Sequence, residues 1–181
     1  MHWIFGYGSL IWRPDFPYAH ARRAAVRGFR RRFWQASPDH RGVPQAPGRV
    51  VTLVADSDAL CHGMAFAARP DHYAAIVAML DEREKNGYAP HTVALEFADG
   101  TRAEALTYIA GPDNPSFVGP APLAAVAAQI ARAHGPSGSN REYLARLATA
   151  LAELGVDDEE VILLQAAVAA LAAPAASVVT R

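Results

Sequence analysis

The most informative ionisable residue in the sequence is Glu84, near the end of a predicted helix over 70–86. At about 100° per residue, Glu84 lies on the same face as Tyr73, Val77 and Leu80, which belong to the apolar stripe of that helix. A buried carboxylate is costly unless it is paired or functional, and the negative end of a helix dipole also disfavours an anion. Both effects raise the pKa of a carboxyl group, as a general base working near neutral pH requires.

Glu84 also has a purely structural interpretation. Near the end of a helix, its side chain can reach solvent or pair with Arg83 or another arginine. The other acidic residues of the helix behave differently, because Glu82 points to the opposite side and Asp81 lies well off the apolar stripe. The periodicity singles out Glu84 but leaves both interpretations open.

The second stretch with chemical potential begins almost at the first residue and reads Trp3-Ile4-Phe5-Gly6-Tyr7-Gly8-Ser9-Leu10. Its first three residues predict a buried strand. Gly6 and Gly8 permit a positive φ or a close approach to a ligand. A strand ending in Gly-x-Gly-Ser can gather backbone N–H groups around an anion or a carbonyl oxygen. A tight turn is the alternative, and the third glycine of a nucleotide-binding fingerprint is missing.

The composition argues against several other classes of site. A single cysteine, Cys61, permits no internal disulfide and no multi-thiolate metal site, and the seven histidines show no metal-binding spacing. There is no Gly-x-Ser-x-Gly elbow of a serine hydrolase, and Ser9 has no obvious histidine partner. The formal net charge of −1 indicates no general attraction to nucleic acid or anionic membrane. We therefore expect no metal, no cofactor, no nucleic acid and no membrane.

Two further stretches have competing interpretations. The run Arg30-Arg31-Arg32 beside Phe33 and Trp34 is compatible with RNA contact, but a strand with one solvated basic face fits the net charge better. The longest apolar run, 161–179, is interrupted by a glutamine and a proline and predicts a packed helix rather than a membrane span. Together with the lone cysteine and the absence of an apolar secretory segment at the N-terminus, these features predict a cytoplasmic protein.

Turn chemistry and periodicity predict the elements that position these residues. Strands are expected at 24–35 with Gly28 as a possible bulge, at 49–55 and 60–68 as a hairpin turning at 56–58, and at 92–97 and 103–109. Helices are expected at 70–86, 123–134 and 157–172, with another capped by Ser139, where Glu142 completes a capping box. The long loop 39–48 is of the kind that carries function. Strands come mostly first and helices mostly last, which predicts one α+β domain over 1–181 with a curved sheet or small barrel.

Seven longer motifs occur in order along the chain: F-G-Y-G-S-L-I-W at 5–12, R-R-F-W-Q at 31–35, D-H-R-G-V-P at 39–44, P-G-R-V-V-T-L at 47–53, R-E-K-x-G-Y at 83–88, D-N-P-x-F-x-G-P-A-P at 113–122 and G-P-S-G-x-N-x-E-Y-L at 135–144. Their order and spacing resemble those of the ChaC-like γ-glutamylcyclotransferases, the glutathione-specific branch, to about Leu154. One departure is Asn86, where relatives have glycine; asparagine ends a helix equally well.

The resemblance implies a γ-glutamylcyclotransferase-like fold, a small mixed β-barrel with surrounding helices. It implies cleavage of glutathione to 5-oxoproline and cysteinylglycine without metal or cofactor. The catalytic glutamate of the family is the one in R-E-K, here Glu84. The glycine-rich loop that binds the γ-glutamyl moiety corresponds here to Ile4, Phe5, Gly6, Tyr7, Gly8 and Ser9. We expect the N–H group of Leu10 to join this loop, and Arg49 and Tyr143 to border the same pocket.

Two other functions remain compatible with these residues. A related cyclotransferase acting on other γ-glutamyl amines or amino acids would share the loop and the glutamate, and a panel of γ-glutamyl compounds would separate the two. A non-catalytic module that binds a small molecule on the same fold is the second alternative. The position of Glu84 on the buried face argues against this module.

Overall fold

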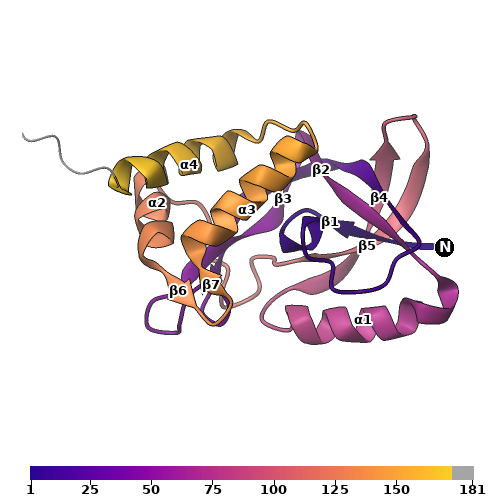
Figure 1. Ribbon diagram of the computed structural model, residues 1–181, viewed down its shortest axis with the longest axis horizontal. Helices are drawn as coiled ribbons and strands as arrows, with labels where there is room; N and C mark the ends of the chain where they lie inside the picture. The colour runs from indigo at the N-terminus through magenta and orange to yellow at the C-terminus, as the bar shows by residue number, and fades with distance from the viewer. Residues whose placement is uncertain (173–181) are drawn as a thin grey trace, which may run out of the picture.

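The computed structural model describes residues 1–172 and shows a closed five-stranded barrel with helices packed around it (Figure 1). The barrel strands are β1 (His2–Gly6), β2 (His20–Ser37), β3 (Gly48–Ala68), β4 (Ala89–Phe97) and β5 (Arg102–Ile109). The other elements are the short 3-10 helix η1 (Ser9–Ile11), α1 (Pro70–Glu84), α2 (Leu123–Arg132), β6 (His134–Gly135), β7 (Gly138–Ser139), α3 (Asn140–Glu153) and α4 (Glu159–Ala172). The predicted α+β class with a small barrel is confirmed.

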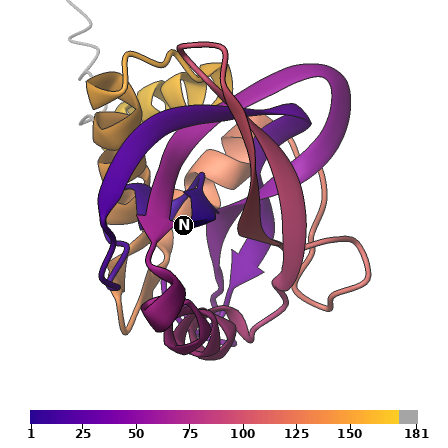
Figure 2. The same cartoon turned by 90° about the vertical axis from the view of Figure 1, so that its right-hand side faces the viewer.

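The strand order around the barrel is β1-β3-β2-β4-β5, and Figure 2 shows the strands curving around the closed ring. Each neighbouring pair in this order is antiparallel. The barrel closes through a parallel pair, in which Trp3 and Ile4 of β1 lie beside Ala105 and Leu106 of β5. This single parallel pair makes the barrel mixed. It also gives β1 a neighbouring strand on each side, so β1 is not an open edge strand.

The hairpin expected over 49–68 is wrong, because β3 is one continuous strand that pairs with β2 both before and after the polar residues 56–58. These polar residues lie opposite a register shift between Arg27 and Phe29. Gly28, which lies between these two, has a φ of 84°, so the bulge predicted there is confirmed. A bulge thus accommodates the polar residues that the sequence pattern assigned to a chain reversal.

The buried side chains form two clusters, one inside the barrel and under the C-terminal helices, the other between the barrel and α1. The larger cluster fills the barrel and its contact with α2, α3 and α4, which Figure 1 draws together at one end of the molecule. The predicted apolar stripe of α3 belongs to it, because all five of its residues are buried: Tyr143, Leu144, Leu147, Leu151 and Leu154. The smaller cluster joins α1 to the barrel and includes Ile4, Phe66, Ile76, Leu80 and Tyr108.

The ends of α1 and α3 matter for the site. α1 begins at Pro70 and ends at Glu84, where the backbone N–H of Tyr88 donates to the Glu84 carbonyl over 3.2 Å. The Ser139 hydroxyl caps α3 by accepting from the Glu142 N–H over 3.1 Å, as predicted.

The C-terminal helix ends the described part of the chain at Ala172. Within residues 1–172, no helix has both the length and the apolar character needed to cross a membrane. The remainder of the apolar run 161–179, beyond Ala172, lies outside the described residues.

Candidate active site

The glycine-rich loop follows β1 directly and turns into η1. Neither Gly6 nor Gly8 has a positive φ, so the first of the two roles that the sequence permits for these glycines is not used. Close packing is the physical reason for both glycines. A Cβ at Gly6 would lie 2.6 Å from the Leu10 Cβ, and one at Gly8 would lie 3.0 Å from a Val51 methyl and 3.3 Å from the Tyr143 hydroxyl.

A buried arginine fixes the orientation of this loop. Arg31 donates from Nε to the Tyr7 carbonyl over 2.7 Å, and its Nη1 pairs with Asp158 over 2.6 Å. In a trans peptide the C=O and N–H point in opposite directions, so the Gly8 N–H faces away from Arg31. Within residues 1–172, no protein acceptor is bound to the backbone N–H groups of Gly8, Ser9 and Leu10. These donors are therefore available to a ligand.

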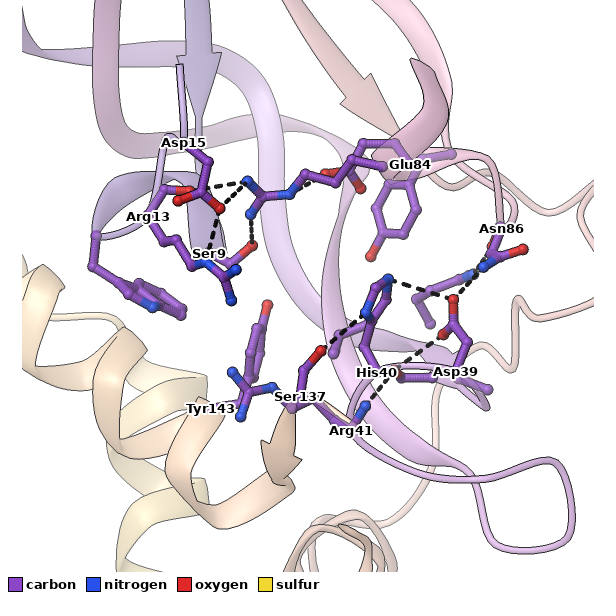
Figure 3. Close-up of a pocket in the computed structure, with 17 residues that line it drawn as sticks. Ser9, Arg13, Asp15, Asp39, His40, Arg41, Glu84, Asn86, Ser137 and Tyr143 are labelled. Atoms are coloured by element: carbon purple, nitrogen blue, oxygen red, sulfur yellow. Dashed lines mark hydrogen bonds and ion pairs between the residues drawn. The ribbon is translucent and has the colours of Figure 1, made fainter. Parts of the chain in front are cut away.

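The loop and Glu84 line the same cavity. A smaller cavity of about 50 Å³ is lined by Phe5, Gly6, Tyr7, Gly8, Ser9 and Leu10 together with Glu84. A larger cavity of about 210 Å³ opens beside it, and Ser9, Glu84, Tyr88 and Tyr143 line both. Glu84 thus lies at the junction of the two cavities, where Figure 3 shows its carboxylate among the lining side chains.

Glu84 is both largely buried and paired with Arg83, so each of the two interpretations left open by the sequence applies in part. Its side chain is only 18% exposed, and Oε1 lies 3.4 Å from the Arg83 Nε. Burial raises the pKa of Glu84, the positive charge of Arg83 opposes this shift, and the negative charge of Asp39 adds to it. The net shift is upward, in the direction that a general base near neutral pH requires.

Arg83 connects Glu84 to the glycine-rich loop. Its Nη2 donates to the Ser9 hydroxyl over 3.0 Å, and its Nη1 donates to the Arg13 carbonyl over 3.0 Å and contacts Asp15 at 3.4 Å. Sequence reasoning considered Arg83 only as a partner of Glu84. Its contacts with the 9–15 segment depend on a chain separation of about 70 residues and have no local signal.

Three tyrosines with hydrogen-bonded hydroxyl groups line the smaller cavity. Tyr88 donates to the Val51 carbonyl over 2.7 Å, and the Tyr143 hydroxyl accepts from the Val51 N–H over 3.4 Å. Tyr7 donates to the Tyr108 carbonyl over 2.7 Å. Burial raises the pKa of Tyr143 to about 12 and raises those of Tyr7 and Tyr88 well above the usual value. All three therefore remain neutral at physiological pH.

Two of the residues expected at the pocket lie elsewhere. Ile4 is fully buried in the cluster under α1 and lines neither cavity. Arg49 also lines neither cavity, because its donors are used at the junction of barrel and helices. Its Nη1 contacts the Phe33 and Gly119 carbonyls at 3.1 and 3.4 Å, and its Nε donates to Gln129 over 2.8 Å.

Six further residues that line the larger cavity had no role assigned from the sequence: Ser37, Asp39, His40, Arg41, Asn86 and Ser137. Most of them belong to the D-H-R-G-V-P and G-P-S-G motifs, so the signal was present as motifs without assigned roles. Among residues 1–172, no three His, Cys, Asp or Glu side chains form an arrangement able to hold a metal ion.

The closed mixed barrel is the γ-glutamylcyclotransferase fold. The crystal structure of a glutathione-specific γ-glutamylcyclotransferase from yeast superposes on it with a TM-score of 0.88 and 33% sequence identity, covering 93% of this chain and 96% of that chain.

The ChaC-like protein family model matches residues 2–171, and the chain belongs to this family. It is 45% identical over 150 residues to the glutathione-specific γ-glutamylcyclotransferase 1 of Homo sapiens, covering 81% of this chain and 68% of the human protein. It is 41% identical over 179 residues to the protein of the same name from Danio rerio, covering 95% of this chain and 91% of that protein.

Proposed function

We propose that this chain is a γ-glutamylcyclotransferase that cleaves glutathione to 5-oxoproline and cysteinylglycine. The observation that carries the proposal is the position of Glu84, a largely buried carboxylate that faces both the glycine-rich loop and the larger cavity. The human and yeast relatives described above bear the same activity in their names. We further propose that the chain functions as a single domain in the cytoplasm, which the lone buried Cys61 supports.

The reaction forms a bond between two groups of the same γ-glutamyl residue. The α-amine of the γ-glutamyl residue attacks its own γ-carbonyl carbon, which forms a new C–N bond and closes a five-membered ring. The amide C–N bond to cysteine then breaks and releases cysteinylglycine. Because the nucleophile is tethered to its electrophile, the protein needs mainly to fold the substrate into an attacking conformation.

Glu84 moves the proton in this scheme. An α-amine with a pKa of ~8 is mostly protonated at neutral pH and cannot attack until it loses a proton. Glu84 accepts one proton from the ammonium group before the attack and passes it to the leaving nitrogen. The second proton, which the new ring nitrogen loses after the attack, passes through the same carboxylate to the released amine, so no proton is gained or lost overall. The raised pKa of Glu84 brings it closer to that of the amine, which eases both transfers.

The glycine-rich loop holds the charged part of the substrate. The N–H groups of Gly8, Ser9 and Leu10 are suited to bind either the α-carboxylate of the γ-glutamyl group or the oxyanion that develops on the γ-carbonyl oxygen. The hydroxyls of Tyr88 and Tyr143 lie next to this loop and stay neutral. The γ-glutamyl group then occupies the smaller cavity, and cysteinylglycine the larger one.

A product assay tests the proposal directly. Purified protein incubated with glutathione should form 5-oxoproline and cysteinylglycine in equal amounts, and EDTA should leave the rate unchanged. Absence of both products would contradict the proposed activity. Loss of activity in EDTA, with recovery on adding a divalent ion, would contradict the mechanism without a metal.

A further inference from the structure

Two loops from distant parts of the sequence, around His40 and around Ser137, are hydrogen-bonded to each other on the side of the larger cavity away from Glu84. The Ser137 N–H donates to the His40 carbonyl over 2.9 Å, and the Ser137 hydroxyl lies 3.2 Å from the His40 Nδ1. Gly135 packs so closely on this loop that a Cβ there would overlap the His40 carbonyl and the Gly42 backbone. Figure 3 shows His40, Ser137 and Arg41 on the side of the pocket away from Glu84.

This junction holds the side chain of Arg41 in place. Only 9% of the side chain is exposed, and its Nη1 contacts the Ser139 carbonyl at 3.2 Å and Glu142 at 3.4 Å. The guanidinium lies 5.6 Å from the centre of the Tyr143 ring. Gly138 makes room for it, because a Cβ at that position would lie 3.0 Å from the Arg41 Nη1. The guanidinium is therefore positioned before any ligand binds.

One edge of this guanidinium remains without a protein partner. Within residues 1–172, Nη1 is the only nitrogen of the Arg41 guanidinium that makes a hydrogen bond to the protein. Every fully buried polar side-chain atom in this part of the chain has a partner, so Nε and Nη2 must reach solvent. Arg41 also lines the larger cavity. Nε and Nη2 form the side-on edge of a guanidinium, which binds a carboxylate through two parallel hydrogen bonds.

The charge of Arg41 is only partly compensated. Burial lowers its pKa, and the nearby Glu142 carboxylate offsets part of this effect. The Glu142 side chain is itself 41% exposed and is shared with Arg146 at 2.8 Å, so solvent screens its attraction to Arg41. A second anion on the cavity side would therefore be bound favourably.

The two other arginines at the cavity are less suited to this role. Arg13 is 61% exposed and is held by Asp15 at 2.7 Å. Arg83 uses all three of its guanidinium nitrogens, on Glu84, on Ser9 and on the 13–15 segment. Among the cavity arginines, Arg41 alone combines burial, a fixed orientation and an unused side-on edge.

We propose that Arg41 binds the C-terminal carboxylate of the dipeptide leaving group and thereby selects glutathione over shorter γ-glutamyl compounds. The inference rests on the proposed function. Two residues of extended chain span about 7 Å from the scissile nitrogen, so a substrate held at Glu84 extends its terminal carboxylate into the larger cavity, which Arg41 also lines. A substrate without this carboxylate leaves the Arg41 edge unpaired and loses a charged hydrogen-bond pair.

The test compares glutathione with its C-terminal amide, which has the same shape without the terminal charge. Wild-type protein should prefer the acid by about 10- to 100-fold in kcat/KM, the range expected for a hydrogen bond to a charged group. Arg41→Gln should lose this preference, because it weakens turnover of the acid much more than turnover of the amide. Arg41→Lys, which keeps the charge but not the two-point geometry, should show an intermediate preference.

Arg146→Gln is the matched control, because it removes the other arginine partner of Glu142 without changing the cavity wall. It should keep the full preference for the acid. Calorimetric binding of acid and amide to a Glu84→Gln protein repeats the comparison without turnover. Equal use of acid and amide by wild-type protein, or an unchanged preference in both Arg41 variants, would overturn the proposal. Binding preference without product formation would contradict the proposed function instead.

Discussion

Arg83 and Ser9 are joined by a hydrogen bond of 3.0 Å, although 74 positions separate them in the chain. The same guanidinium lies 3.4 Å from Glu84, so one cation links the carboxylate to the glycine-rich loop. Asp39, on the opposite wall, acts on Glu84 with the opposite sign. The ionisation of Glu84 is thus set by burial and by two charged residues that can be changed separately.

Arg83→Gln should raise the pKa of Glu84 further, because it removes the cation that favours the ionised form. Glu84 must be ionised to accept the proton, so the acidic limb of the pH dependence of kcat should move to higher pH. The loss of activity should therefore be larger at acidic than at alkaline pH. Arg83→Lys, which retains a positive charge, should show a smaller displacement. An acidic limb that stays in place in Arg83→Gln would show that Arg83 does not act on Glu84.

Asp39→Asn should move the same limb to lower pH. The Asp39 carboxylate disfavours the negative charge on Glu84, so its removal lowers the pKa of Glu84. Buried tyrosines do not confuse the measurement, since the pKa values of Tyr88 and Tyr143 are raised far above this range. Asp39 also accepts a hydrogen bond from Asn86, so Asn86→Ala serves as a control for local structure. Displacement in the same direction as for Arg83→Gln would contradict the electrostatic account.

Gly8→Ala should reduce activity through steric overlap. The new Cβ would lie 3.0 Å from a Val51 methyl and 3.3 Å from the Tyr143 hydroxyl, at the wall of the smaller cavity. Overpacking of this kind typically costs ~1–3 kcal/mol, and we expect a fall in kcat/KM of about 10- to 100-fold. Gly111→Ala is the matched control, because no atom lies within 4 Å of its new Cβ. Full activity in Gly8→Ala would show that the loop need not pack this closely.

The sequence predicts the elements of this fold well wherever the local pattern is decisive. The apolar stripe of α3, the Ser139 cap and the bulge at Gly28 all follow from neighbouring residue types. The hairpin at 56–58 was wrong because a polar Asp-Ser-Asp run fits a turn and a bulge equally well. Only the pairing of both halves of β3 with β2 decides between them. That pairing is a tertiary property.

The site was predictable in part for the same reason. Helical periodicity places Glu84 on the buried face of α1 without any knowledge of the barrel. The glycines of the loop were identified, but their purpose was not, because the atoms they approach belong to Leu10, Val51 and Tyr143. Arg49 was also expected to border the pocket. Its side chain turns toward Gln129 and two carbonyls that no local pattern reveals.

Glutathione should be turned over more efficiently than γ-glutamyl-alanine. Both contain the γ-glutamyl group, which the glycine-rich loop is proposed to bind. Only glutathione places a carboxylate two residues beyond the scissile bond, where Arg41 is proposed to bind it. Steady-state kinetics with a panel of γ-glutamyl amines, amino acids and glutathione measure this preference. Equal kcat/KM for glutathione and γ-glutamyl-alanine would place the protein among cyclotransferases of broader specificity.

Glu84→Gln tests the central assignment. Glutamine keeps the shape of the side chain but cannot accept and return a proton, and loss of general acid–base catalysis typically lowers the rate about 10²- to 10⁴-fold. Glu82→Gln, on the exposed side of the same helix, is the control and should retain activity. Wild-type turnover in Glu84→Gln would exclude Glu84 as the general base.

Stability should respond to Glu84→Gln in the opposite direction from activity. The pKa of Glu84 is higher in the folded state than in the unfolded chain, so ionisation of Glu84 opposes folding. The free energy of unfolding therefore falls as the pH rises from the ordinary pKa of a glutamate to the raised pKa of Glu84. A neutral glutamine removes that cost. The variant should therefore melt at the same temperature as wild type near pH 4, where Glu84 is protonated, and at the same or a higher temperature near pH 7. Thermal unfolding at both pH values measures the difference. A variant that is inactive and strongly destabilised at pH 7 would instead identify Glu84 as a structural residue.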